Sequence, residues 1–156
     1  MTPLETILIQ TSISLALAIL TAYLTVRFAL HRFYREKWWE AKMRAYTDIL
    51  QALHHMKRDL EISFDAERFG REETDHDKAW EKKGRAAWEE IRKQTDMGEF
   101  LFSSESLSIL KKLISDTETR ADYYVEHLVQ YEAAVTECLP AIKASARKDL
   151  GLPKLN

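Results

Sequence analysis

Two patterns of apolar residues divide the chain into a short N-terminal segment and a longer remainder. From Thr6 to Val26 there are 21 consecutive residues without a charge, and their apolar side chains point all round a helix. A helix of that length spans about 30 Å, which is the thickness of the hydrocarbon core of a bilayer. A helix on the surface of a soluble protein would instead carry one apolar stripe. The pattern therefore predicts a transmembrane helix.

A buried helix in the core of a soluble protein is the alternative interpretation of this segment. The chain has only 156 residues, and a domain of that size rarely surrounds a whole helix. A cleaved signal peptide fits poorly, because it needs basic residues before its apolar stretch and this chain has Glu5 there. We therefore expect two parts: residues 1–30, with the transmembrane helix and its juxtamembrane start, and residues 31–156, a cytoplasmic helical bundle.

The distribution of charge predicts how the transmembrane helix is oriented. All 23 lysine and arginine residues lie at or after Arg27. By the positive-inside rule, the C-terminal part lies in the cytoplasm and the N-terminus outside, an arrangement that suits a bacterial inner membrane. Aromatic residues alternate with the first basic residues, as they do at the level of lipid headgroups. The expected membrane-interface residues are Arg27, Arg32, Phe33, Tyr34, Arg35 and Lys37.

The predicted span is rich in hydroxyl groups and in small side chains. A threonine or serine hydroxyl in a helix can donate to the preceding turn, so its cost in lipid is modest, but it can also line a polar path. The polar residues of the span are Thr6, Gln10, Thr11, Ser12, Ser14, Thr21 and Thr25. Ser14, Ala18 and Ala22 stand four residues apart and form a ridge of small residues, which lets two helices approach closely in lipid. This ridge predicts self-association of the span.

Beyond the span the apolar residues recur in alternating steps of three and four, a pattern typical of helical bundles. Neither Gly nor Pro occurs between Arg27 and Phe69, so we expect the first helix to continue from the membrane into the bundle without a joint. Gly70 is a plausible end for this helix, and Thr74 or Asp75 can cap a second helix. That second helix is expected to run to about residue 93.

A third helix is expected from Ser104, because the three–four alternation then continues unbroken to Cys138. A capping-box pattern at residues 115–118 leaves a break near residue 116 open, although the constant phase favours one continuous helix. Pro140 should kink or end it. The predicted fold is all-α: a single N-terminal transmembrane helix continuous with a cytoplasmic antiparallel three-helix bundle or coiled coil, plus a short C-terminal helix over residues 141–150.

Two features of the bundle sequence suggest close packing or binding. Gly84 lies one turn from Trp80 and from Trp88, so we expect the gap to receive a bulky side chain from the first helix, such as Trp39. The loop before the third helix contains three consecutive apolar residues. Because loops run over the surface, these side chains dock on the bundle, bind a partner protein or touch the membrane. The candidate partner-binding loop is Phe100, Leu101 and Phe102.

The sequence contains no candidate catalytic residues. The chain lacks the motifs of nucleotide-binding proteins, zinc proteases and α/β-hydrolases. One Glu-x-x-His pair occurs, Glu73 and His76, whereas di-metal bundles need two. Cys138 falls on an apolar seam position, where a thiol is usually inert. We therefore predict no catalytic, cofactor-binding or metal-binding residue.

Overall charge argues against a nucleic-acid partner, since 23 basic residues face 25 acidic ones and the pI is near 6.2. The leading hypothesis is a non-enzymatic, single-pass membrane protein whose helical bundle binds itself or another, unidentified protein. The first alternative is a membrane effector whose spans assemble into a pore that the bundle triggers. A metal-dependent helical-bundle enzyme is the weaker alternative.

Overall fold

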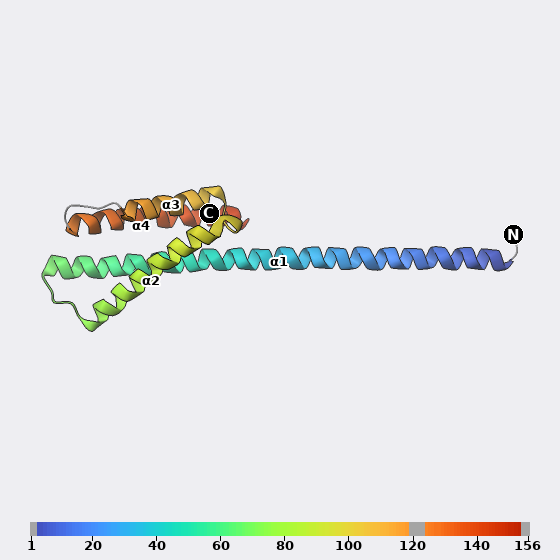
Figure 1. Ribbon diagram of the computed structural model, residues 1–156, viewed down its shortest axis with the longest axis horizontal. Helices are drawn as coiled ribbons and strands as arrows, with labels where there is room; N and C mark the ends of the chain where they lie inside the picture. Colours follow the sequence, from blue (N-terminus) through green and yellow to red (C-terminus); the bar gives the residue numbers. More distant parts are fainter. Residues whose placement is uncertain (1–2, 119–123, 154–156) are drawn as a thin grey trace. The chain divides into compact units, whose positions relative to one another are not determined.

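The computed structural model describes residues 3–118 and 124–153, and it describes side chains in 14–118 and 125–153. These residues form four α-helices and one short 3₁₀-helix (Figure 1). No strand occurs in the described ranges, so the all-α prediction is confirmed. The elements are α1 (Pro3–Phe69), α2 (Asp75–Met97), η1 (Gly98–Phe100), α3 (Ser104–Glu118) and α4 (Tyr124–Asp149).

The chain forms two compact units, Met1–Glu40 and Ala41–Asn156. In the first unit the apolar side chains of α1 are exposed from residue 15 to residue 30. Within the described residues, α1 is the one helix that is long and apolar enough to cross a membrane. The structure therefore confirms a long apolar helix near the N-terminus, and this helix runs on to Phe69 without a joint, as predicted.

The second unit is held together by one core to which all four α-helices contribute. Fully burying an aliphatic side chain stabilises a fold by about 1.5–3 kcal/mol, so this core is the main stabilising feature of the unit. The core includes Tyr46, Ile49, Leu53, Met56 and Leu60 of α1, Ala87 and Ile91 of α2, Leu110 and Leu113 of α3, and Leu128, Val135, Cys138 and Ile142 of α4.

The prediction of a continuous third helix is wrong, because α3 and α4 are separate helices that pack against each other. Their contacts show that they run antiparallel: Glu105 pairs with Lys148, and Ser106 contacts Ser145. The chain direction in α4 is therefore opposite to that in α3. The alternative that was left open, a break near residue 116, lies close to Glu118, where α3 ends.

A kink or a helix end was expected at Pro140, and the helix end does not occur, since Pro140 lies inside α4. The predicted short helix at 141–150 is instead the last part of α4. Both halves of α4 bury residues in the same core, Cys138 before the proline and Ile142 after it. This shared packing offsets the backbone hydrogen bond that proline cannot make.

The turn between α1 and α2 follows the predicted signals. Gly70 has a φ of 54°, the left-handed conformation that favours glycine after a helix. Thr74 caps α2, so the choice left open between Thr74 and Asp75 is settled. The Thr74 hydroxyl accepts from the backbone N–H of Asp77 at 3.3 Å, and the Asp77 carboxylate accepts from that of Thr74 at 2.9 Å.

Asp59 of α1 fills the gap at Gly84. The expectation that a bulky side chain such as Trp39 fills it is wrong. A Cβ atom at Gly84 would lie 2.6 Å from Cγ of Asp59 and 2.8 Å from its Cβ. Glycine therefore allows α2 to approach α1 closely while a carboxyl group occupies the space between them.

Candidate functional site

The first unit contains the predicted membrane-interface residues and the ridge through which two copies of the span were predicted to associate. Two of the span's hydroxyl groups donate to carbonyl oxygens of the preceding turn: Thr21 to Leu17 and Thr25 to Thr21, each at 2.8 Å. These bonds satisfy the hydroxyls within the helix, so they lower the cost of placing the segment in lipid. The side chains of Thr6, Gln10, Thr11 and Ser12 lie outside the described residues.

The three residues of the small-residue ridge lie on the first unit's part of α1. Ser14, Ala18 and Ala22 lie one turn apart along α1, and all three are exposed. A ridge of this kind presents little side-chain bulk, which is the condition for close contact between two helices in lipid.

The predicted membrane-interface residues are all exposed on α1. They differ in their local partners. Lys37 forms an ion pair with Glu40 at 2.8 Å, and its ammonium group lies 5.9 Å from the ring centre of Phe33. Arg27 contacts the hydroxyl of Tyr23 at 3.3 Å. Arg32 and Arg35 form no ion pair within the described part of the chain, so their charges are available to other groups.

The three apolar residues of the predicted partner-binding loop lie in different environments. Phe100 is 81% exposed, Leu101 is half-buried, and Phe102 is only 6% exposed. The Phe102 ring packs over Gly98 and meets the ring of Tyr46 edge-on, with 4.9 Å between the ring centres. Docking on the bundle therefore accounts for Phe102, and the partner hypothesis is left with Phe100 as its exposed residue.

A buried polar network at one end of the second unit was missed at the sequence level. The Tyr46 hydroxyl lies 2.7 Å from that of Ser106, which in turn lies 2.7 Å from that of Ser145. Tyr46 also donates a hydrogen bond to the carboxylate of Asp149. The same carboxylate accepts from the backbone N–H of Ser103 at 3.0 Å. The network thus joins α1, α3 and α4 through side chains that are far apart in the sequence.

The electrostatics of this network keep its groups in fixed protonation states. Burial and the hydrogen bond to Asp149 raise the pKa of Tyr46 well above its usual value. For Asp149, burial alone would raise the pKa, but hydrogen bonds from Tyr46 and Ser103, with the charge of Lys42 at 3.7 Å, lower it below 3.8. At neutral pH the phenol is therefore neutral and the carboxylate is charged. General acid–base catalysis needs a pKa near the working pH, so this arrangement is better suited to positioning helices.

The pKa of a second carboxyl group, that of Asp59, is shifted in the opposite direction, upward. It lies over Gly84 and faces Glu81 and Arg85 of α2 and Tyr131 of α4. Burial, followed by repulsion from Glu81, raises its pKa from 3.8 to about 6, although Arg85 partly opposes the shift. The charged form of Asp59 is therefore disfavoured in the folded protein.

Asp59→Asn is expected to stabilise the protein at pH about 7.5 by about 1 kcal/mol, after allowance for solvent screening of this half-buried group. Because the folded pKa is raised, the folded state binds more protons than the unfolded state between the two pKa values. Lowering the pH through this range should stabilise the wild type, and the advantage of the variant should vanish near pH 4. Urea denaturation at both pH values measures this; a constant advantage would contradict it.

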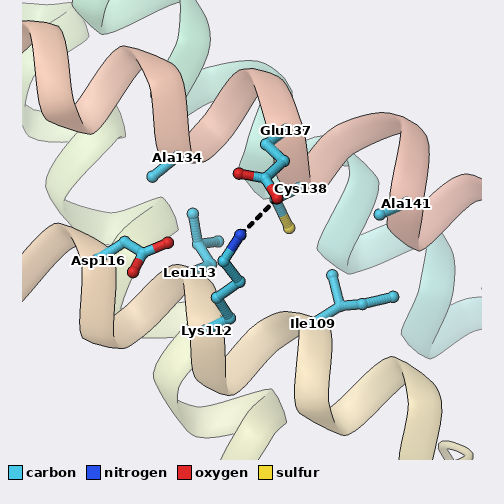
Figure 2. A pocket seen from close by; sticks show the side chains of 8 residues that line it. All are labelled: Ile109, Lys112, Leu113, Asp116, Ala134, Glu137, Cys138 and Ala141. Atoms are coloured by element: carbon cyan, nitrogen blue, oxygen red, sulfur yellow. Dashed lines mark hydrogen bonds and ion pairs between the residues drawn. The ribbon is translucent and has the colours of Figure 1, made fainter.

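Cys138 lines a small cavity of about 60 Å³ between α3 and α4. Figure 2 shows Cys138 beside Glu137 on α4, and Lys112 reaching across from α3 to pair with Glu137. Burial, with a smaller contribution from the charge of Glu137, raises the pKa of the thiol to about 12. The thiolate is the reactive form of cysteine, so the structure supports the interpretation of Cys138 as inert packing.

Alkylation of Cys138 by iodoacetamide at pH about 8 is expected to be at least about 100-fold slower in the folded protein than in urea, because the raised pKa and burial both suppress the reactive thiolate. Mass spectrometry of timed samples measures the two rates. Equal rates would show that the thiol is accessible and would contradict its buried placement.

Histidine residues do not gather with other ligands in the described structure. His76 accepts a hydrogen bond from the indole of Trp80 at 3.2 Å, and the rings of His54 and His55 are centred 6.0 Å apart. Within the ranges that the structure describes, no group of three His, Cys, Asp or Glu side chains is arranged to hold a metal ion.

Comparison with known proteins returned no relative. No protein-family model, no curated protein and no solved structure matches the chain.

Proposed function

We propose that the apolar segment of α1 crosses a lipid bilayer and that the unit Ala41–Asn156 is a cytoplasmic, non-enzymatic interaction module. The observation that carries this proposal is the exposed apolar surface of α1, which includes Leu15, Leu17, Ile19 and Leu20. A continuous apolar surface of this length is costly in water and stable in lipid. The internally bonded hydroxyls of Thr21 and Thr25 support the same placement.

The orientation follows from the charges that flank this segment. Basic residues begin at Arg27, directly after Val26, and aromatic residues follow among them. We propose that the N-terminus is outside the cytoplasm and that the helical unit is inside, at the inner membrane of a bacterial cell.

A labelling experiment tests this topology. In a Cys138→Ala background, single cysteines replace Thr2 or Asn156, and intact spheroplasts are treated with a membrane-impermeant maleimide. Thr2→Cys should be labelled in intact cells, and Asn156→Cys only after lysis. The reverse pattern would refute the orientation, and labelling of neither site in intact cells would refute an external N-terminus.

We propose that the span associates with a second copy through the ridge of Ser14, Ala18 and Ala22. Ala18→Leu adds bulk to the ridge and should reduce association in lipid. Ala16→Leu is the matched control, because it makes the same change about 200° away around the helix. Cross-linking in vesicles, measured over a series of protein-to-lipid ratios, compares the two variants. Equal loss in both, or in neither, would count against this interface.

A pore assembled from several spans is the second candidate, motivated by the hydroxyl-rich sequence of the segment. The bonds of Thr21 and Thr25 to the helix backbone argue against it, because these hydroxyls are already satisfied without water. A dye-leakage assay on liposomes discriminates between the two functions. The interaction module predicts no leakage at any protein density, whereas density-dependent leakage would favour the pore.

A further inference from the structure

One side of α1 just after the apolar segment is cationic. At about 100° per residue, Arg27, Arg32 and Arg35 fall within an arc of about 140°, and Phe28 and Trp39 lie in the same arc. The acidic residues of this stretch, Glu36 and Glu40, lie outside the arc. All of these side chains are exposed. We call the surface formed by Arg27, Arg32 and Arg35 the arginine face.

The arginine face differs in its ion pairing from the opposite side of the helix. Lys37, on the opposite side, is paired with Glu40 at 2.8 Å, so its charge is already balanced. Among the described residues, Arg32 and Arg35 have no acidic group within ion-pair distance. The uncompensated positive charge of this stretch is therefore concentrated on one side.

The direction of the side chains brings these charges toward the apolar segment. Side chains on an α-helix lean toward its N-terminus, and Arg27 shows this by contacting Tyr23, one turn earlier. Arg32 and Arg35 lie about 8 Å and about 12 Å beyond Arg27 along the axis, whereas a headgroup layer is about 5–8 Å thick. Because an arginine side chain is long and leans toward the N-terminus, both guanidinium groups can reach headgroup level.

We propose that the arginine face binds the headgroups of anionic phospholipids in the leaflet where α1 leaves the membrane; this rests on the proposed transmembrane placement of α1. Guanidinium groups form paired hydrogen bonds with phosphate oxygens. Phe28 supplies an aromatic side chain of the kind found at headgroup level. The occupant is an anionic lipid because the face is cationic and directly continues the apolar segment.

Lipid selectivity of the full chain in vesicles tests the proposal. The probes are spin-labelled phosphatidylglycerol and spin-labelled phosphatidylcholine in phosphatidylcholine vesicles, and the motionally restricted fraction gives the relative association constant. The wild type should prefer phosphatidylglycerol. Arg35→Gln should reduce the preference by up to about five-fold, the contribution of one charge near the surface.

Lys37→Gln is the matched control, since it removes one positive charge two residues further on but about 200° away around the helix. Because its charge is balanced by Glu40, it should reduce the preference by clearly less than Arg35→Gln does. Equal effects of Arg35→Gln and Lys37→Gln, or no preference in a wild type that is inserted in the vesicles, would overturn the arginine face while leaving the span intact. If the wild type does not insert at all, the proposed span itself fails.

Discussion

Replacing Asp149 with alanine is expected to lower the free energy of unfolding by about 3 kcal/mol. The carboxylate accepts hydrogen bonds from Tyr46 and from the backbone N–H of Ser103, and it lies 3.7 Å from the ammonium group of Lys42. Its side chain is only 9% exposed, so water cannot replace it without rearrangement. The substitution leaves a donor unsatisfied at the point where α1, α3 and α4 meet.

Urea denaturation of the full chain in detergent, followed by far-UV circular dichroism, measures this loss. Glu105→Ala is the matched control, because Glu105 also pairs with a lysine near this end of the unit but is exposed. The pKa of Asp149 is lowered in the folded state, so its contribution is present above pH about 4 and is lost as the pH falls below that value. The prediction fails if the two variants are equally stable at neutral pH.

Replacing Gly84 with alanine is expected to destabilise the protein by about 2 kcal/mol, even though alanine normally favours a helix. The new Cβ would meet Asp59 at 2.6 Å from Cγ and 2.8 Å from Cβ. Because an aspartate side chain is short, it cannot move away without shifting its own backbone. We therefore expect α1 and α2 to separate locally near Asp59.

Asp59→Ala provides the test of this cause. In the double variant Asp59→Ala/Gly84→Ala the carboxyl group is gone, but the Cβ of residue 59 remains close. The double variant should therefore recover part of the stability lost by Gly84→Ala, and a double-mutant cycle measures the coupling. Strictly additive effects would show that Asp59 is not the residue that requires glycine at position 84.

The parts of the fold that depend on local sequence were predictable. The long first helix follows from a stretch without Gly or Pro, and the α1–α2 turn follows from Gly70 and Thr74. The division between α3 and α4 was not predictable, because both helices bury a stripe of apolar residues in the same core. Their apolar residues therefore keep one phase from α3 into α4. The helix end expected at Pro140 does not occur for a related reason. The packing of Cys138 and Ile142 stabilises α4 on both sides of the proline.

The buried polar network shows why part of the site was beyond sequence reasoning. Ser106 and Ser145 occupy polar positions that a helical pattern assigns to the surface, yet both are buried. Only the antiparallel packing of α3 and α4 brings them together beside Tyr46. Phe102 illustrates the converse: it belongs to a loop in the sequence pattern, but Gly98 provides the space that lets its ring enter the core.

Extraction of isolated membranes with alkaline carbonate shows whether the apolar part of α1 resides in lipid. Full-length protein is expressed, membranes are collected and washed at pH about 11, and the pellet and supernatant are compared by immunoblot. A helix that spans the bilayer should keep the protein in the pellet until detergent releases it. Release into the supernatant as a monodisperse soluble species would contradict it.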